Sequence, residues 1–154
     1  MSEAEGYEIL SAPGLLGEGK PLSAVQFRIR TTRAIERRDI TEEVSKAAEK
    51  LSASSGALLV SVPHTTAAVV VGENWDADVT GDVERALGAW VPTVRFDHGE
   101  GNSPAHFLSE AIGNSRLVPL ESGRLALGRW QGIFLVELDG PRERTVEVRL
   151  LAAP

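Results

Sequence analysis

The chain has 154 residues, of which 42% are hydrophobic and 25% are charged, a length and composition that suit one compact domain. Its 22 acidic residues outnumber the 16 basic ones and give a net charge of −6 at pH 7, which disfavours binding to a nucleic-acid backbone. The absence of cysteine excludes disulfides, thiolate metal ligands and cysteine nucleophiles.

Residues 1–22 are predicted to form an N-terminal extension that docks loosely or not at all on a domain of residues 23–154. They contain four glycines and two prolines and show no hydrophobic period. Glu3 and Glu5 stand where a signal peptide would be basic. No segment of the chain approaches the roughly 20 apolar residues of a membrane span. We therefore expect a cytoplasmic protein without a membrane partner.

Two strands with one exposed face are predicted near the ends of the domain. Val25, Phe27 and Ile29 alternate with polar residues, and residues 146–150 repeat this pattern. Three segments between them are apolar on both faces and are predicted as central strands: 57–62, 67–71 and 133–138. Half-exposed strands are typical of antiparallel sheets.

Helices are predicted after Thr41 and after Asp78. The first has apolar residues at i, i+3, i+4 and i+7 from Val44 and closes at Gly56. The second ends before Pro92. A third, shorter helix is expected from Pro104 with Ser103 as its cap, which places His106 in its first turn.

These elements do not alternate as in a doubly wound sheet, so the predicted class is α+β. We expect a single domain with a mainly antiparallel or mixed, sandwich-like β-sheet and two to three helices.

All three histidines lie in turns or at a helix start, among polar residues. His64 lies in a turn between two apolar strands, and His98 and His106 flank a glycine-rich loop. Three imidazoles and a water molecule are ligands that catalytic zinc sites use, so we predict a divalent metal, zinc above others, at His64, His98 and His106. The alternative for His64 is a turn histidine bonded to the backbone.

Two familiar nucleotide and hydrolase motifs are not supported. Residues 101–105 approximate the nucleophile elbow of serine hydrolases, but Pro104 has no N–H to donate to an oxyanion. Gly99 and Gly101 fail as a dinucleotide fingerprint because position 104 is not glycine. Ser103 therefore remains a helix cap.

Further polar residues are candidates for substrate contacts. Glu73 follows the strand that His64 precedes, so it lies either across the mouth of the site or far from it. Arg124, Arg129 and Gln131 suit a phosphate or carboxylate group, with a solvated surface position as the alternative for each arginine. Trp130 suits the core or a subunit interface.

Taken together, the sequence motifs resemble the YjbQ-like family from about Val25 to Leu150. The resemblance is carried by the runs His64-Thr65-Thr66-Ala67-Ala68, Glu73-Asn74, Pro104-Ala105-His106 and Gly123 to Gln131, with Asp82, Pro92, His98, Gly113 and Glu137 between and after them. It implies an α+β fold, a homotrimer and, as in some members, a secondary thiamine-phosphate synthase activity. It also implies a metal or ligand site at the three histidines, with Glu73, Asn102 and Gln131 nearby.

Three functions stay open. The first is an enzyme that joins an aminopyrimidine diphosphate to a thiazole phosphate with release of pyrophosphate, in which magnesium could accompany the diphosphate. The second is metal-dependent hydrolysis of a small phosphorylated or carboxylated compound, with Glu73 as base. The third is a non-catalytic trimer that binds a metal or an anion. The assigned roles are catalytic for Glu73 and Gln131, and substrate binding for Thr65, Asn102, Arg124 and Arg129.

Overall fold

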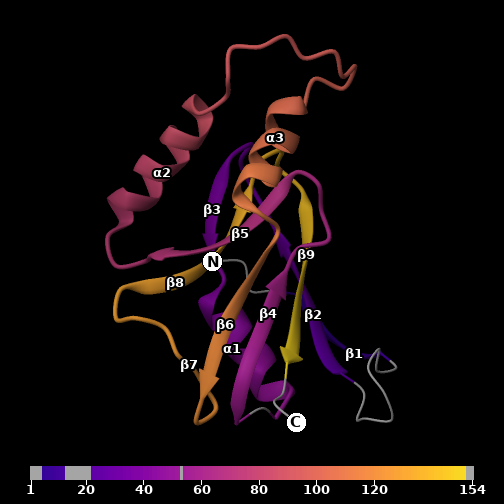
Figure 1. Ribbon diagram of the computed structural model, residues 1–154, viewed down its shortest axis with the longest axis vertical. Coiled ribbons are helices and arrows are strands. Elements are labelled where there is room, and N and C mark those ends of the chain that lie inside the picture. Colours follow the sequence, from indigo (N-terminus) through magenta and orange to yellow (C-terminus); the bar gives the residue numbers. More distant parts are fainter. Residues whose placement is uncertain (1–4, 13–21, 53, 152–154) are drawn as a thin grey trace.

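The computed structural model describes residues 5–12, 22–52 and 54–151 (Figure 1). Strands and helices alternate irregularly along the described residues. In chain order they are β1 (Glu5–Ala12), β2 (Leu22–Arg30), β3 (Glu36–Asp39), α1 (Thr41–Lys50), β4 (Ser55–Ser61), β5 (Ala67–Glu73), α2 (Ala77–Ala89), α3 (Ser103–Ile112), β6 (Ser115–Glu121), β7 (Arg124–Leu125), β8 (Gln131–Glu137) and β9 (Glu143–Leu151).

The strands form two antiparallel sheets. The larger has the order β1-β2-β9-β4-β6-β7, and the smaller has the order β3-β8-β5. Neighbouring strands run antiparallel in both sheets. The prediction of an α+β domain with a mainly antiparallel sheet and two to three helices is confirmed.

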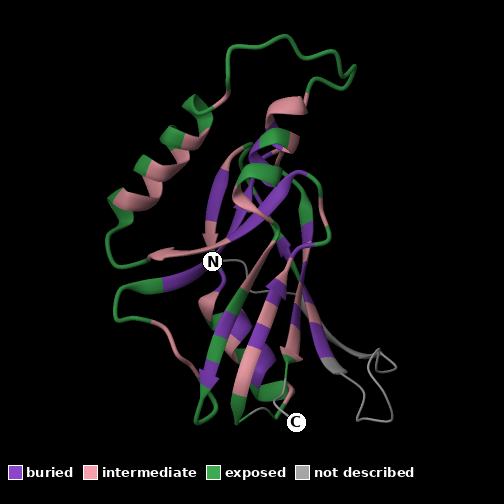
Figure 2. Cartoon of the chain, viewed as in Figure 1, coloured by how far each residue is buried: buried purple, intermediate pink, exposed green. Residues whose placement is uncertain are grey.

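The core lies between the sheets and α1. The alternation predicted in β2 is confirmed, because Val25, Phe27 and Ile29 are buried and pair with the neighbouring strand β9. Helix α1 adds Val44 and Ala47 to the same cluster. Each large apolar side chain buried here contributes roughly 1.5–3 kcal/mol, which makes this cluster the main support of the fold (Figure 2).

The N-terminal residues differ from the prediction. Residues 5–12 form the edge strand β1, which pairs with β2 from Ala12↔Leu22 to Glu5↔Arg28. The expectation of a loosely docked extension is therefore wrong for this segment, because strand pairing does not require the hydrophobic alternation that was sought there. Residues 1–4 and 13–21, the rest of that extension, lie outside the described residues.

The helix caps also differ from those predicted. Helix α1 begins at Thr41, so its N-cap is Ile40, which makes no side-chain cap bond, and the Asp39 carboxylate accepts the backbone N–H of Thr41 at 2.9 Å. Asp76, not Asp78, caps α2 by accepting the N–H of Asp78. Helix α3 begins at Ser103, with Asn102 at the cap position and no side-chain cap bond. The free amides at a helix start can be bonded by acidic or hydroxyl residues at neighbouring positions. The sequence therefore predicts where each helix starts only to within one or two residues.

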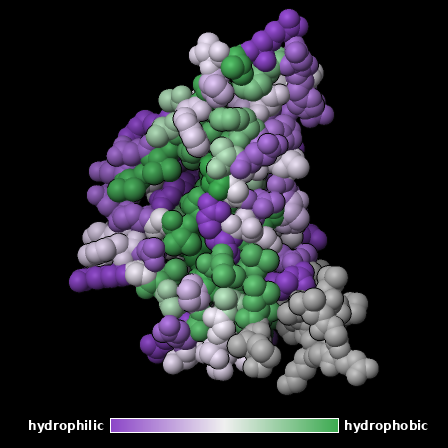
Figure 3. Space-filling model, in the orientation of Figure 1, coloured by the Kyte–Doolittle hydropathy of each residue, from purple (hydrophilic) through white to green (hydrophobic). Residues whose placement is uncertain are grey.

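Helix α2 contacts the smaller sheet through β3, where Arg37 donates its backbone N–H to Glu84 and its Nη1 to Thr80, both at 2.7 Å (Figure 1). None of its residues is buried, although Leu87 packs against a small cluster around Leu108. Hydrophobic side chains gather beside α2 and continue over the strands on the face drawn in Figure 3. No helix in the described residues is long and apolar enough to span a membrane.

Candidate functional site

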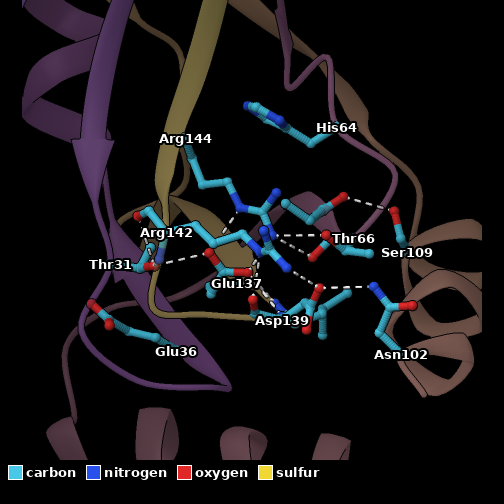
Figure 4. A network of polar contacts seen from close by, with 12 residues as sticks. Thr31, Glu36, His64, Thr66, Asn102, Ser109, Glu137, Asp139, Arg142 and Arg144 are labelled. Atoms are coloured by element: carbon cyan, nitrogen blue, oxygen red, sulfur yellow. Dashed lines mark hydrogen bonds and ion pairs between the residues drawn. The ribbon is translucent and has the colours of Figure 1, made fainter. Parts of the chain in front are cut away.

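The site is built where several strand ends meet. The segment 62–66 leaves β4 in the larger sheet and enters β5 in the smaller one, and it carries His64. The same region contains the end of β2, the end of β8 and the start of β9, which bring Thr31, Glu137 and Arg144 beside it (Figure 4). Residues far apart in sequence thus converge on one end of the domain.

A buried ion pair lies at the centre of this region. Arg144 donates from Nε to Glu137 Oε2 at 2.8 Å and from Nη2 to Glu137 Oε1 at 2.5 Å. The Glu137 side chain is 0% exposed and that of Arg144 is 5% exposed. Burial alone would raise the pKa of Glu137, but the bonds from Arg144, the Asp139 N–H and Thr31 hold it below its ordinary value.

Neighbouring groups complete the polar network. Thr31 donates its hydroxyl to Glu137 at 2.9 Å, and Thr66 accepts from Arg144 Nη2 at 2.8 Å (Figure 4). Breaking such a buried, hydrogen-bonded pair is strongly destabilising, whereas an apolar replacement of both partners is often neutral. Stability alone therefore does not explain a buried ionic network at this place, and such networks mark candidate functional sites.

His64 is held in one tautomer. The backbone N–H of Thr145 donates to its Nε2 at 2.8 Å, so the neutral ring carries its hydrogen on Nδ1. Burial and the charge of Arg144 both lower the pKa of His64, so the ring is neutral near pH 7. His64 is thus a hydrogen-bond donor through Nδ1, and coordination of a metal by either nitrogen would cost the bond to Thr145 or shift the tautomer.

His106 is the same Nδ1-protonated tautomer, but the ring nitrogen left free is Nε2, whereas in His64 it is Nδ1. Its Nδ1 lies 3.0 Å from the carbonyl oxygen of Thr65, which can only accept, so Nδ1 carries the hydrogen and Nε2 presents a lone pair. A backbone carbonyl that accepts from the other ring nitrogen is typical of histidines that bind a metal. The His98 ring lies beside it, with the ring centroids 5.8 Å apart, and its Nε2 is 3.8 Å from a carboxylate oxygen of Glu100.

The three histidines do not form a complete metal site within one chain. The described residues contain no group of three or more His, Asp or Glu side chains placed to hold a metal ion. The three predicted metal ligands therefore fall into two groups. His98 and His106 are a candidate pair of metal ligands, whereas His64 is a hydrogen-bond donor. The three-histidine set expected from sequence does not fit a metal as one unit here.

A pocket of about 310 Å³ opens beside His64. It lies between the β4–β5 connection and the C-terminal half of α3. Its lining residues are His64, Thr65, Ser109, Glu110, Gly113 and Asn114.

The sequence matches the family model described as "UPF0047 protein YjbQ-like" over residues 25–153. It is 43% identical over 127 residues to the UPF0047 protein YugU of Bacillus subtilis, covering 81% of this chain and 96% of that protein. It is 37% identical to the UPF0047 protein MJ1081 of Methanocaldococcus jannaschii, with 82% and 92% covered. The chain therefore belongs to the YjbQ-like (UPF0047) family.

Solved structures agree with this assignment. A YjbQ/UPF0047 family protein from Clostridium acetobutylicum, described as an uncharacterized conserved protein, has a TM-score of 0.78 and 40% identity, with 82% of this chain and 98% of that chain covered. A YbjQ-like protein of unknown function from Sulfolobus solfataricus P2 has a TM-score of 0.78 and 30% identity, with 96% and 100% covered. The YjbQ-like fold is thus shared along nearly the whole length of these relatives.

In this YjbQ-like chain, Glu73 and Gln131 pair with each other at the far end of the β5–β8 ladder. Glu73 comes six positions after Ala67 along the strand, roughly 20 Å at the usual rise, so Glu73 and Gln131 lie away from His64. Glu73 Oε1 accepts the N–H groups of Trp75 and Asp76, and Gln131 Oε1 accepts that of Gly128. Their observed contacts are those of turn residues.

The proposed substrate-binding residues are divided in the same way. Thr65 lines the pocket, and Asn102 donates from Nδ2 to Asp139 Oδ2 at 3.0 Å while its Oδ1 is buried without a partner. Arg124 lies in the short strand β7, and Arg129 stacks on Trp130 with its guanidinium carbon 4.6 Å from the ring centroid. Both arginines are exposed, and neither lines the pocket beside His64.

Glu137 and Arg144 were missed as site residues, although two signals could have found them. Glu137 is a carboxylate inside the apolar segment 133–138, where only a paired charge is tolerated. Arg144 stands two residues before Val146 and four before Val148, so the alternation of β9 places it on the buried face. Reading both signals together would have predicted a buried ion pair.

Proposed function

We propose that this protein is an enzyme that acts on a small phosphorylated or otherwise anionic compound in the pocket beside His64. The observation that carries the proposal is the buried Glu137–Arg144 network next to a histidine held in a donor tautomer at a pocket wall. Pockets with a few convergent polar groups are the usual sites of small-molecule chemistry.

The proposed reaction is the one implied by the family resemblance, the joining of an aminopyrimidine diphosphate to a thiazole phosphate. The thiazole nitrogen forms a bond to the methylene carbon of the pyrimidine, the carbon–oxygen bond to the diphosphate breaks, and pyrophosphate leaves. Negative charge grows on the departing oxygens, and donors fixed before the reaction stabilise it most effectively. His64, through Nδ1, is the neutral donor proposed for this role.

In this proposal, a divalent metal ion binds only at His98 and His106. Those two side chains are the proposed ligands, with zinc expected there and magnesium as the alternative when a diphosphate is bound. Such an ion would supply charge neutralisation for a diphosphate. The hydrolase alternative loses support, because the base it requires, Glu73, lies at the far end of β5 in the same chain.

The decisive experiment is an assay of purified protein with both phosphorylated substrates, with and without added divalent cation. We expect turnover to fall at least tenfold in His64→Ala, since one oriented donor in such a site contributes about a hundredfold or more to the rate. His98→Ala should reduce the cation dependence of the rate. Equal rates for His64→Ala and wild type would refute the assigned role, and turnover of generic phosphate esters alone would favour hydrolysis.

We further propose that the protein assembles as the homotrimer that the resemblance implies. Helix α2 has no buried residue, and Trp75, Trp90 and Trp130 are 74%, 53% and 43% exposed. Large exposed aromatic side chains beside an amphipathic helix with no buried residue are typical of subunit interfaces. Sedimentation analysis of the full chain tests this proposal, and a monomer at micromolar concentration would contradict it.

A further inference from the structure

Within the part of the chain that the structure describes, one nitrogen of the buried Arg144 guanidinium makes no hydrogen bond. Nε and Nη2 donate to Glu137 and Thr66, whereas Nη1 has no partner among the described residues. In the described chain, the buried side-chain polar atoms that are both sealed from solvent and unpartnered are Glu73 Oε2 and Asn102 Oδ1. Arg144 Nη1 is therefore not sealed, although the residue as a whole is only 4% exposed.

This free nitrogen lies on the His64 side of the network. In Figure 4 the guanidinium of Arg144 lies below the imidazole of His64, with Glu137 on its other side. The two Glu137 bonds fix the plane of the guanidinium and leave Nη1 directed away from Glu137. His64 contributes the Nδ1 hydrogen that its bond from Thr145 leaves available. A cationic donor therefore lies on the side of the network that faces His64, the neutral donor that lines the pocket.

We propose that Arg144 Nη1 and His64 Nδ1 form a subsite for one oxyanion group, a phosphate or a carboxylate, of a small molecule. The proposal rests on the function proposed above and names the residues that recognise its anionic group. An arginine fixed by a carboxylate is well suited to this task, because its fork is already oriented and charge-assisted hydrogen bonds are stronger than neutral ones. Glu110 is the carboxylate that also lines the pocket, and it is exposed, so the anion is assigned to the His64 wall of the pocket, on the side where Arg144 lies.

The test uses the full-length protein after chelator treatment, so that no metal contributes. Inorganic phosphate is titrated while the amide resonance of Thr145 and the ring nitrogens of His64 are followed by NMR. We expect a saturable shift at these positions. A parallel titration with acetate shows whether the subsite prefers a tetrahedral or a planar anion.

Two variants with the same change of charge separate the subsite from general electrostatics. Arg144→Gln should weaken phosphate binding at least tenfold. Arg142→Gln, whose side-chain bonds go to Asp139, should leave it within twofold of wild type. Should Arg144→Gln fail to fold, His64→Ala removes the second donor without touching the ion pair and should weaken phosphate binding several-fold.

The subsite is overturned if neither anion causes a saturable shift at Thr145 or His64. It is also overturned if Arg142→Gln weakens binding as much as Arg144→Gln, or if His64→Ala binds phosphate as wild type does. Phosphate binding at these residues together with no synthase turnover would contradict the proposed function and leave the subsite intact. Synthase turnover without phosphate binding at these residues would support the proposed function and contradict the subsite.

Discussion

Two arginines in neighbouring positions of the site differ in how much of their charge is buried. The side chains of Arg144 and Glu137 are 5% and 0% exposed, whereas those of Arg142 and Asp139 are 52% and 24% exposed. Removing one partner of a buried pair leaves a charge without compensation, but an exposed pair is screened by water. The two positions therefore offer a controlled comparison at nearly the same place in the fold.

Arg144→Ala should lower the free energy of unfolding by about 3–5 kcal/mol. Arg142→Ala should lower it by less than about 1 kcal/mol. Urea denaturation of both variants measures the difference. Similar losses in the two variants would show that Glu137 gains another partner when Arg144 is removed.

His64 should make stability depend on pH in a defined window. Its pKa is lowered in the folded protein from the ordinary value of 6.5, so the unfolded chain binds more protons below that value. The free energy of unfolding therefore decreases as the pH falls through about 6.5. It stops decreasing once the pH is below the pKa of His64 in the folded protein. Losses from Glu137 and Asp139, whose pKa values are also lowered, begin at more acidic pH, near their ordinary values of 4.5 and 3.8.

The change to test is His64→Gln, whose amide oxygen can still accept the Thr145 N–H. We expect its unfolding free energy to fall less steeply than that of wild type between pH 7 and the start of carboxylate titration. His98→Gln, at an exposed histidine, is the matched control. Chemical denaturation at a series of pH values gives the slopes, and parallel curves for His64→Gln and wild type would contradict the prediction.

For single residues, the sequence predicted which polar side chains lie near the site better than it predicted their hydrogen-bond partners. His64 could be predicted as a turn residue near a site, and the alternative of a backbone bond was also named. The ring nitrogen left free, Nδ1 in His64 and Nε2 in His106, could not be predicted, because it depends on a hydrogen bond to a residue far away in the sequence, Thr145 or Thr65.

Among the elements, the turn between β8 and β9 is tightly packed at the site. A Cβ added to Gly140 would lie 2.2 Å from the backbone oxygen of Arg33 and 2.7 Å from Glu137 Cγ. A backbone atom cannot rotate away as a side chain can. Gly99, in the loop before α3, has nothing within 4 Å of the same position.

Gly140→Ala should therefore destabilise the protein by about 1–3 kcal/mol or more, as overpacking does. Gly99→Ala should change stability by no more than about 0.5 kcal/mol. Thermal unfolding of the two variants is a direct measurement. A Gly140→Ala protein as stable as wild type would mean that the β8–β9 turn moves freely from Arg33.

Elements with a strong hydrophobic period were predicted well. The alternation in β2 and the stripe of α1 both point into the core, because burial of one face produces the pattern that the sequence displays. Strand β1 and the caps of the helices were not predicted, since backbone pairing and short polar bonds leave no periodic trace.

At the scale of the whole molecule, the two ends of β5 could not be assigned from sequence. The sequence shows that His64 precedes the predicted strand 67–71 and that Glu73 follows it. It does not show which loops meet at either end of that strand. The ladder Glu73↔Gln131 together with the neighbouring Trp75–Trp130 contact, with ring centroids 4.9 Å apart, places these candidates in a second polar and aromatic cluster. The pairing of β5 with β8 places that cluster at the opposite end of the ladder from Ala67 and Glu137, which lie near His64.

The proposed assembly gives the last prediction. Trp90 follows α2 directly and is more than half exposed, so a trimer formed through this surface would bury it. Trp90→Glu places a charge in that interface and should shift the protein from trimer toward monomer at micromolar concentration. Arg85→Ala, also exposed on α2, should leave the mass unchanged. Sedimentation velocity measures both variants, and a Trp90→Glu protein that remains trimeric would place the interface elsewhere.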